Sequence, residues 1–263
     1  MNFKKIIPER FRKRIGRSIK VARYLGYKYE CPFCGHKTND FYPIGLDIPI
    51  LSKKKVSGAG RRNGGCYKCH SGDRERLVYA YLVHKFNLYE RPKDIRILHI
   101  APEENISKKI IDNGFNNYIC GDLFAEGYNY PDYVQNIDVL SIPFGDNHFD
   151  LIICNHVLEH IDRDTDAMGE LYRVLKVKGK AILQVPLSKN STRTFEDVKI
   201  KDPKEREVKF GQSDHVRLYG SDFGDRLESI GFSVQHSNLF QEFSKFGIAK
   251  DEDIYIASKL SYE

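Results

Sequence analysis

From residue 95 onward, short apolar runs alternate with segments whose apolar residues recur at helical spacing. The apolar runs predict strands at residues 95–100, 118–123, 135–140, 149–155 and 180–185. The helical spacing predicts helices at residues 105–113, 164–177 and 221–230, and Gly179 is expected to stop the second. Residues 232–240 and 253–260 predict a closing antiparallel pair. This alternation indicates an α/β fold with a mostly parallel sheet and helices on both faces.

The polar, charged segment 187–219 interrupts this alternation directly after the strand that ends at Pro186. An insertion at the carboxyl edge of a parallel sheet lies where such folds bind ligands, so the segment is interpreted as a substrate lid. The alternative is a disordered loop. Phe195, Phe210 and the run G-Q-S-D-H-V-R-L-Y-G at 211–220 favour an ordered lid.

The chain before residue 91 has a different character. Residues 1–25 predict a basic amphipathic helix, which could pack on its own protein or make weak contact with an anionic membrane surface. Packing on its own protein is the favoured reading. Residues 26–90 form a cysteine-containing module that ends in a bridging helix, and residues 91–263 form the second domain.

Charge and hydropathy narrow the classes of partner. The net charge is +6, but the first 25 residues hold nine Lys or Arg residues and one Glu, so the remainder is near neutral. Nucleic-acid binding would therefore rest on the tail alone and is not expected. No apolar run reaches the roughly 20 residues that span a bilayer, and no signal-peptide core follows the basic start. A cytoplasmic protein without a transmembrane segment is expected.

Two C-x-x-C pairs, Cys31/Cys34 and Cys66/Cys69, lie in the N-terminal module. Two such pairs supply four thiolates for a tetrahedral zinc ion, and a complete shell of four thiolates indicates a structural rather than a catalytic ion. The alternatives are reduced structural cysteines or, less favoured, a thioredoxin-type pair. His70 could also replace Cys69 as a ligand.

Polar side chains follow the ends of the predicted strands. The first strand runs into L-H-I-A-P-E at 98–103, the second ends at Asp122, and the fourth runs into N-H-V-L-E-H at 155–160. Together with D-V-L-S-I-P-F at 138–144 and V-L-K-V-K-G-K-A-I-L at 174–183, this order resembles the class I methyltransferases that use S-adenosylmethionine. The resemblance runs from about residue 95 to the C-terminus. It implies a Rossmann-like, seven-stranded, mostly parallel sheet, here with a small N-terminal zinc-ribbon module.

The resemblance also implies a set of cofactor-binding positions. The first turn lacks the family's usual glycines, and His99 stands where an acidic residue is typical. Asp122 is in place to accept the ribose hydroxyls, Asp138 to accept the adenine amine, and Glu103 to reach the amino group. The complete implied set is His99, Ala101, Pro102, Glu103, Asp122, Leu123, Asp138, Val139 and Asn155.

A narrower resemblance rests on the order L-H-I-A-P-E, C-N-H-V-L-E-H, Q-V-P and D-H-V-R-L-Y-G behind the knuckle C-Y-K-C-H-S-G-D-R-E-R. This order is similar to a bacterial group of zinc-ribbon methyltransferases that often belong to capsule and surface-glycan biosynthesis. In that group a cofactor turn without glycines is normal.

His156, Glu159 and His160 have the spacing of one helical face, and His215 of the lid could join them. The arrangement is similar to the Glu-x-x-Glu-His site, with a distant His, of small-RNA 2′-O-methyltransferases and of ubiquinone-pathway O-methyltransferases. That similarity implies a second divalent metal that would bind and orient a substrate oxygen. The alternative is a metal-free pocket in which His156 or His160 acts as the base.

Beside His215, Arg217 and Tyr219 are the candidates for binding an anionic substrate. The hypothesis is O-methylation of a small anionic glycan-related metabolite, such as a nucleotide sugar, a sugar phosphate or a phosphoramidate. Two alternatives stay open. One is an RNA methyltransferase with a zinc-ribbon RNA-binding module, and the other is a non-catalytic binding module.

Overall fold

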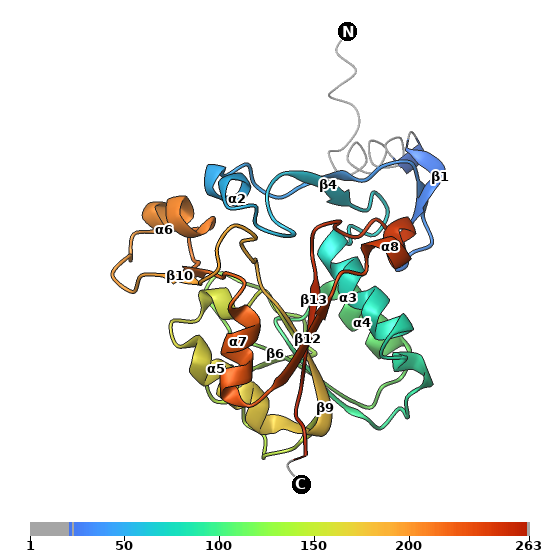
Figure 1. Cartoon of the computed structure of the whole chain (residues 1–263). Helices are drawn as coiled ribbons and strands as arrows, with labels where there is room; N and C mark the ends of the chain where they lie inside the picture. Colours follow the sequence, from blue (N-terminus) through green and yellow to red (C-terminus); the bar gives the residue numbers. More distant parts are fainter. Residues whose placement is uncertain (1–20, 23, 262–263) are drawn as a thin grey trace.

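The computed structural model describes residues 21–22 and 24–261, and its centre is a seven-stranded sheet (Figure 1). The strand order is β12-β13-β9-β8-β5-β6-β7. β13 runs antiparallel to both of its neighbours, and the remaining pairings are parallel. The strands are β5 (Arg96–Ile100), β6 (Asn117–Asp122), β7 (Val134–Asn136), β8 (Phe149–Asn155), β9 (Leu175–Gln184), β12 (Ser233–Ser237) and β13 (Ile254–Ser258). The predicted Rossmann-like α/β fold is confirmed.

Helices cover both faces of this sheet. Ile97, Leu151 and Ile153 belong to one buried cluster, whereas Leu98 and Ile152 belong to another. Alternate residues of one strand thus face opposite layers, which is the period-two pattern of a sheet buried on both sides. α3 (Asp73–His84) and α4 (Glu104–Asp112) cover the first face, and α5 (Asp164–Val174) and α7 (Phe223–Ile230) cover the second (Figure 1).

Two predicted boundaries were wrong. The helix expected over 164–177 ends at Val174, and β9 begins at the next residue, so Gly179 lies inside a strand. Backbone hydrogen bonds from Lys178 to Lys259 and from Lys259 to Gly179 hold this segment against the chain after β13, so tertiary pairing overrides the local signal. The strand expected over 135–140 is only β7, since the Asp138 carboxylate accepts from the Leu140 amide and turns the chain.

The N-terminal module lies across the end of the sheet to which the parallel strands point (Figure 1). It contains two small antiparallel pairs and one short helix. These are β1 (Leu25–Glu30) with β2 (Lys37–Thr38), β3 (Tyr42–Ile44) with β4 (Arg62–Gly65), and α2 (Pro49–Lys53). Helix α3 and the 3-10 turn η2 (Leu88–Glu90) connect the module to β5. The amphipathic helix predicted for residues 1–25 falls almost entirely outside the described residues.

Arg76 of α3 joins the module to the C-terminal part of the chain. Its side chain is fully buried. Its Nη1 donates to the Ser71 carbonyl at 2.6 Å and its Nη2 to the Gly64 carbonyl at 2.9 Å. Its Nε and Nη2 also donate to the carbonyls of Phe246 and Gly247, both at 2.7 Å. One buried guanidinium therefore holds two regions of the chain together.

The lid segment is ordered. It contains β10 (Phe195–Glu196), α6 (Pro203–Phe210) and β11 (Arg217–Leu218), and β10 pairs with β11. Its start is tied to the N-terminal module, since the Ser57 amide donates to the Leu187 carbonyl and the Lys189 amide to the Lys55 carbonyl. The remaining elements are the turn η3 (Leu158–His160), α8 (Phe240–Phe243) and η4 (Ser244–Phe246). Among the helices of the described chain, none has the length and apolar character to cross a membrane.

Candidate active site and cysteine cluster

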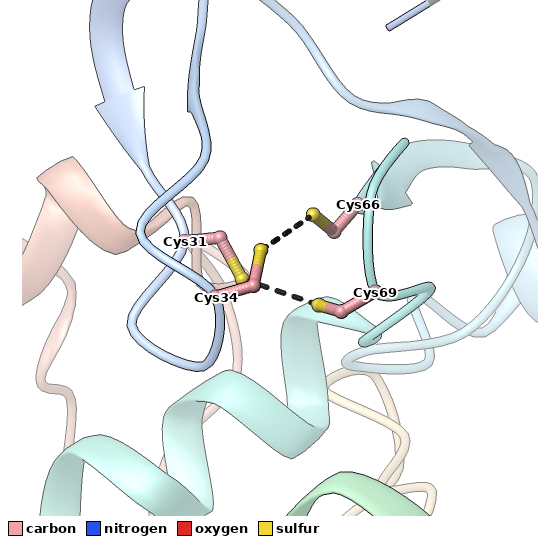
Figure 2. Close-up of side chains that lie close together, drawn as sticks. All are labelled: Cys31, Cys34, Cys66 and Cys69. Atoms are coloured by element: carbon pink, nitrogen blue, oxygen red, sulfur yellow. Dashed lines mark hydrogen bonds between the residues drawn. The ribbon is translucent and has the colours of Figure 1, made fainter. Parts of the chain in front are cut away.

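The four predicted zinc ligands converge in the N-terminal module (Figure 2). The Sγ atoms of Cys31 and Cys69 lie 3.5 Å apart, and those of Cys34 and Cys66 lie 3.7 Å apart. Four sulfurs around a zinc ion at the usual bond length would lie about 3.8 Å from one another. The cysteines are unpaired, and these separations far exceed a disulfide bond. The cluster is therefore compatible with tetrahedral zinc.

The two cysteine pairs lie on matching backbone turns. In the first, the Gly35 amide donates to the Cys31 carbonyl, and in the second, the His70 amide donates to the Cys66 carbonyl. Gly35 and His70 both have left-handed backbones, with φ of 65° and 64°. His70 therefore turns the backbone after the second cysteine pair. The fourth residue of the cluster is Cys69, as predicted, and not His70. Such turns aim both sulfurs of a pair at one point.

A cavity of about 320 Å³ opens where the N-terminal module, the lid and the end of β8 meet. The module contributes Gly45, Leu46, Leu51, Gly58, Ala59, Gly60 and Arg62, and α3 contributes Arg74. The other walls are His156, Glu159 and His160 after β8, and Pro186, Gly211, Gln212 and His215 of the lid segment. Four of the predicted catalytic residues thus share one cavity at the carboxyl edge of the sheet, although they come from two separate segments.

Glu159, His160 and His215 form a tight cluster in this cavity. One ligand atom from each lies within 4.8 Å of the others. The rings of His160 and His215 meet edge to face, with centroids 4.7 Å apart. The lid backbone is fixed to this cluster, since the Val216 amide donates to the Glu159 carbonyl at 2.9 Å.

His156 lies outside that cluster of three. Its backbone is left-handed, with φ of 56°, and a 3-10 turn rather than an α-helix follows it. The sequence spacing assumed a regular helical face, which this backbone does not provide. His156 Nδ1 instead lies 3.2 Å from Nη1 of Arg74. Because a guanidinium only donates, this nitrogen is the acceptor.

Burial has the largest effect on the pKa values of the histidines and the glutamate in this cavity. It lowers the pKa of His156 well below its ordinary value and that of His215 to about 4. The pKa of His160 is also lowered by burial, against the opposing charge of Asp214. Burial raises the pKa of Glu159 to about 8. Neutral imidazoles are the form that accepts a proton or binds a metal ion.

Arg217 and Tyr219 lie beneath the cavity rather than in its wall. Arg217 is 2% exposed, and its guanidinium donates to the carbonyls of Leu158, Ile161 and Asp162. The Tyr219 hydroxyl donates to Asp164 Oδ2 at 2.6 Å. Neither residue is among those that line the cavity. Both side chains instead anchor the turn that carries the cavity residues.

The predicted cofactor turn is held by a chain of hydrogen bonds. His99 Nε2 lies 2.6 Å from Glu103 Oε2, and Asn155 Nδ2 donates to Glu103 Oε1 at 3.0 Å. Burial raises the pKa of Glu103, but the hydrogen bonds and charge of His99 outweigh it, so the pKa lies below its ordinary value. Ala101 has a left-handed backbone, with φ of 48°. His99, at the position typical of an acid, thus positions the acid four residues later.

A second cavity, of about 220 Å³, lies beside the end of β6. Its walls are Pro102, Glu104, Asp122, Tyr130, Pro131, Tyr133 and Val134. The other residues implied by the resemblance do not line it: Leu123 is exposed, and Val139 is buried in the core. Asp138 caps the turn at Leu140. Two predicted cofactor residues, Pro102 and Asp122, therefore share this cavity.

Sequence reasoning missed Arg74, Asp214 and Glu252. Arg74 stands in the D-R-E-R run after the second cysteine pair, which supports the narrower resemblance and a bridging helix but does not mark a site residue. Asp214 lies beside the predicted ligand His215, and its Oδ2 is 3.2 Å from His160 Nδ1. Glu252 is buried in the loop before β13, where no sequence pattern marks it.

Comparison with known proteins agrees with this architecture. Residues 107–183, from within α4 to β9, match a methyltransferase-domain family. An uncharacterised protein of Methanocaldococcus jannaschii is 44% identical over 66 residues, which are 24% of this chain and 28% of that protein. The chain therefore spans only a small part of this relative.

Solved structures resemble the fold at low sequence identity. The [4+2]-cyclase SpnF has a TM-score of 0.51 and 11% identity, over 83% of this chain and all of the cyclase. An S-adenosylmethionine-dependent methyltransferase from Mesorhizobium loti has a TM-score of 0.47 and 11% identity, over 71% of this chain and 97% of that one. The sheet topology is that of a Rossmann-like methyltransferase fold, and residues 107–183 of it carry the match to the methyltransferase-domain family.

Proposed function

We propose that this chain is an S-adenosylmethionine-dependent methyltransferase, and that it methylates an oxygen of a small anionic glycan-related metabolite as a step in the modification of a capsule or surface polysaccharide. A nucleotide sugar, a sugar phosphate or a phosphoramidate has suitable chemistry. The observation that carries this proposal is the guanidinium of Arg74 in the wall of the cavity, beside His156 and the Glu159 cluster.

Arg74 differs from the other arginine of the cavity in its partners. Arg62 is neutralised by Asp73, to which its Nε and Nη2 donate at 2.5 and 2.7 Å. The side chain of Arg74 instead donates to an uncharged imidazole. The charges of Glu159 and Glu252 act on Arg74, but neither carboxylate accepts a hydrogen bond from it in the described structure. Its guanidinium therefore keeps donors for a phosphate or carboxylate group of a ligand.

The dimensions of the cavity favour a small acceptor. Its volume of about 320 Å³ is at the lower end for small-molecule sites, and the loops of the N-terminal module form one wall. An RNA strand would need an open, positively charged groove. These features favour a metabolite over the RNA alternative.

The proposed chemistry places the acceptor oxygen near the histidines. S-adenosylmethionine supplies the methyl group, so the new C–O bond forms as the C–S bond breaks and its electron pair stays on sulfur. In a metal-free pocket, His160 is suited to take the acceptor's proton, since Asp214 holds its Nδ1 and leaves Nε2 as the accepting nitrogen. Arg74 would hold the anionic group and fix the oxygen's direction.

We further propose that S-adenosylmethionine extends from the Asp122 cavity toward Asn155, with Asp122 accepting from the ribose and Glu103 from the amino group. Zinc in the cysteine cluster would hold the loops that form the wall of the acceptor cavity. Neither Cys31 nor Cys66 would contact the acceptor, because both are buried away from that wall.

Calorimetric titration of S-adenosylhomocysteine into the zinc-loaded enzyme tests the cofactor site. We expect saturable binding at one site, weakened at least tenfold in Asp122→Ala and unchanged in Asp132→Ala on the neighbouring loop. Transfer of labelled methyl from S-adenosylmethionine to a panel of nucleotide sugars and sugar phosphates then tests the acceptor class. Methylation of RNA, with no transfer to any phosphorylated sugar, would contradict the proposal.

A further inference from the structure

We infer that Glu159, His160 and His215 bind a divalent transition-metal ion in the wall of the acceptor cavity. The ion would be separate from the one suited to the four cysteines. This inference rests on the proposed function for its role, but not for its test, because metal binding is measured without any acceptor.

The strongest indication is the carboxylate of Glu159. The residue is only 1% exposed, and neither of its side-chain oxygens has a hydrogen-bond partner in the described structure. His156 Nδ1 approaches Oε1 to 3.6 Å, but that nitrogen already accepts from Arg74 and has no proton to donate. A buried carboxylate without donors is costly unless it is neutralised by a proton or a cation.

The two histidines are prepared as ligands. Asp214 lies 3.2 Å from His160 Nδ1, which leaves Nε2 with its lone pair for a metal. A carboxylate that holds the far nitrogen of a ligating histidine is a recurring arrangement in metal sites. His215 Nδ1 is buried and has no hydrogen-bond partner in the described structure. These two groups complete a set of one carboxylate and two imidazoles whose ligand atoms lie within 4.8 Å.

Three protein ligands leave coordination positions for another molecule. Two imidazoles and one carboxylate with open positions suit zinc, iron(II) or manganese(II), in contrast to the closed shell of four cysteines. All three residues line the same cavity as Arg74. The open positions would therefore face the space proposed for the acceptor.

An ion at this place would act on the acceptor hydroxyl. It would polarise the oxygen and lower its pKa, so the proton would pass to water in the cavity and His160 would serve as a ligand rather than as the base. Arg74 would hold the anionic end of the same molecule. The acceptor would therefore be bound at two places: its hydroxyl at the metal ion and its phosphate or carboxylate at Arg74.

The test is manganese binding to protein that carries zinc only at the cysteines. Manganese(II) has little affinity for thiolate sites, so its electron paramagnetic resonance signal reports the second site alone. We expect one bound manganese per chain. Glu159→Gln and His215→Ala should weaken binding more than a hundredfold, Asp214→Asn roughly 10–100-fold, and the surface control His236→Asn not at all. Cysteine-bound zinc, measured in the same samples, verifies that each variant is folded.

A second readout separates metal binding from a merely structural role. Since Gln keeps the shape of Glu without the buried charge, Glu159→Gln should raise the melting temperature of the manganese-free protein. It should also abolish the further rise that manganese causes in the wild type. Unchanged manganese binding in Glu159→Gln and His215→Ala, or no manganese bound by the wild type, would overturn the inference.

These results are independent of the cofactor titration. Binding of S-adenosylhomocysteine without binding of manganese would support the methyltransferase proposal and contradict the metal site. Binding of manganese at Glu159 without binding of S-adenosylhomocysteine would support the metal site and contradict the methyltransferase proposal.

Discussion

Nη1 of Arg74 donates a hydrogen bond to Nδ1 of His156 across 3.2 Å, joining residues 82 positions apart in the chain. Arg74 lies in the first turn of α3, which follows the second cysteine pair, and His156 follows the last residue of β8. The contact therefore connects the N-terminal module directly to the carboxyl edge of the sheet.

Replacement of Arg74 should weaken binding of the acceptor but not binding of the cofactor. We expect Arg74→Met to raise the KM for a phosphorylated acceptor at least tenfold, because an anionic group loses its charged partner. The affinity for S-adenosylhomocysteine should stay within twofold of the wild type. Arg74→Lys should recover part of the loss, and the exposed control Arg163→Met should have no effect. An unchanged KM in Arg74→Met would remove this residue from the acceptor site.

Loss of one thiolate should release the ion from the cysteine cluster. We expect Cys66→Ser to lose its zinc and to unfold at a clearly lower temperature, because a structural ion contributes directly to folding. Cys120→Ala is the matched control, since Cys120 is a buried cysteine of β6 outside the cluster. It should keep a full equivalent of zinc. Metal content and thermal melting measure both, and equal zinc in the two variants would contradict the assignment.

Tyr219 should prove to be a stabilising residue. Its hydroxyl donates to Asp164, which also accepts from Arg226 at 2.7 Å. Tyr219→Phe should therefore lower the free energy of unfolding by about 1–2 kcal/mol, which is the usual cost of a lost buried hydrogen bond. The KM for the acceptor should not change. Denaturant unfolding and steady-state kinetics measure the two quantities, and a tenfold rise in KM would return Tyr219 to the acceptor site.

Glu252 should make the stability fall as the pH rises. It is 3% exposed, its Oε2 lacks a hydrogen-bond partner in the described structure, and burial raises its pKa from 4.5 to about 7. The folded state thus holds a proton that the unfolded state releases, so the contribution of Glu252 to stability is fully present below pH 4.5 and is lost as the pH rises to about 7.

Glu252→Gln removes this decline. Relative to the wild type, the variant should be up to about 3 kcal/mol more stable at pH 8 than at pH 4.5. Urea unfolding of both proteins across this range gives the difference. The exposed control Glu228→Gln should follow the wild type, and parallel curves for Glu252→Gln and wild type would contradict the assignment.

The sequence predicted the fold well because its signals are local. Alternating apolar runs and helical spacing mark the sheet and its helices, and two spaced cysteine pairs mark the cluster. The site was predicted less completely. The spacing of His156, Glu159 and His160 assumed a helix, whereas His156 has a left-handed backbone and stays outside the cluster that Glu159 and His160 form with His215.

Long-range contacts account for the remaining differences. Arg74 gains its role only when the N-terminal module lies on the sheet, and nothing in its neighbours along the chain indicates His156. Arg217 was expected in the substrate site because it follows His215 by two residues. In the fold, its guanidinium instead serves the carbonyls of the turn below the cavity. Proximity in the sequence thus placed Arg217 beside a cavity residue, whereas the fold turns its side chain away from the cavity.

The buried guanidinium of Arg76 couples the stability of the N-terminal module to that of the C-terminal segment. Its donors serve carbonyls on both sides of the boundary between the module and the C-terminal segment. If the module opened, this charge would lose half of its acceptors while the other half kept it out of water, a state too costly to persist. The N-terminal module and the C-terminal segment should therefore unfold together as one cooperative unit, so that disruption of the cysteine cluster would also destabilise the edge of the sheet.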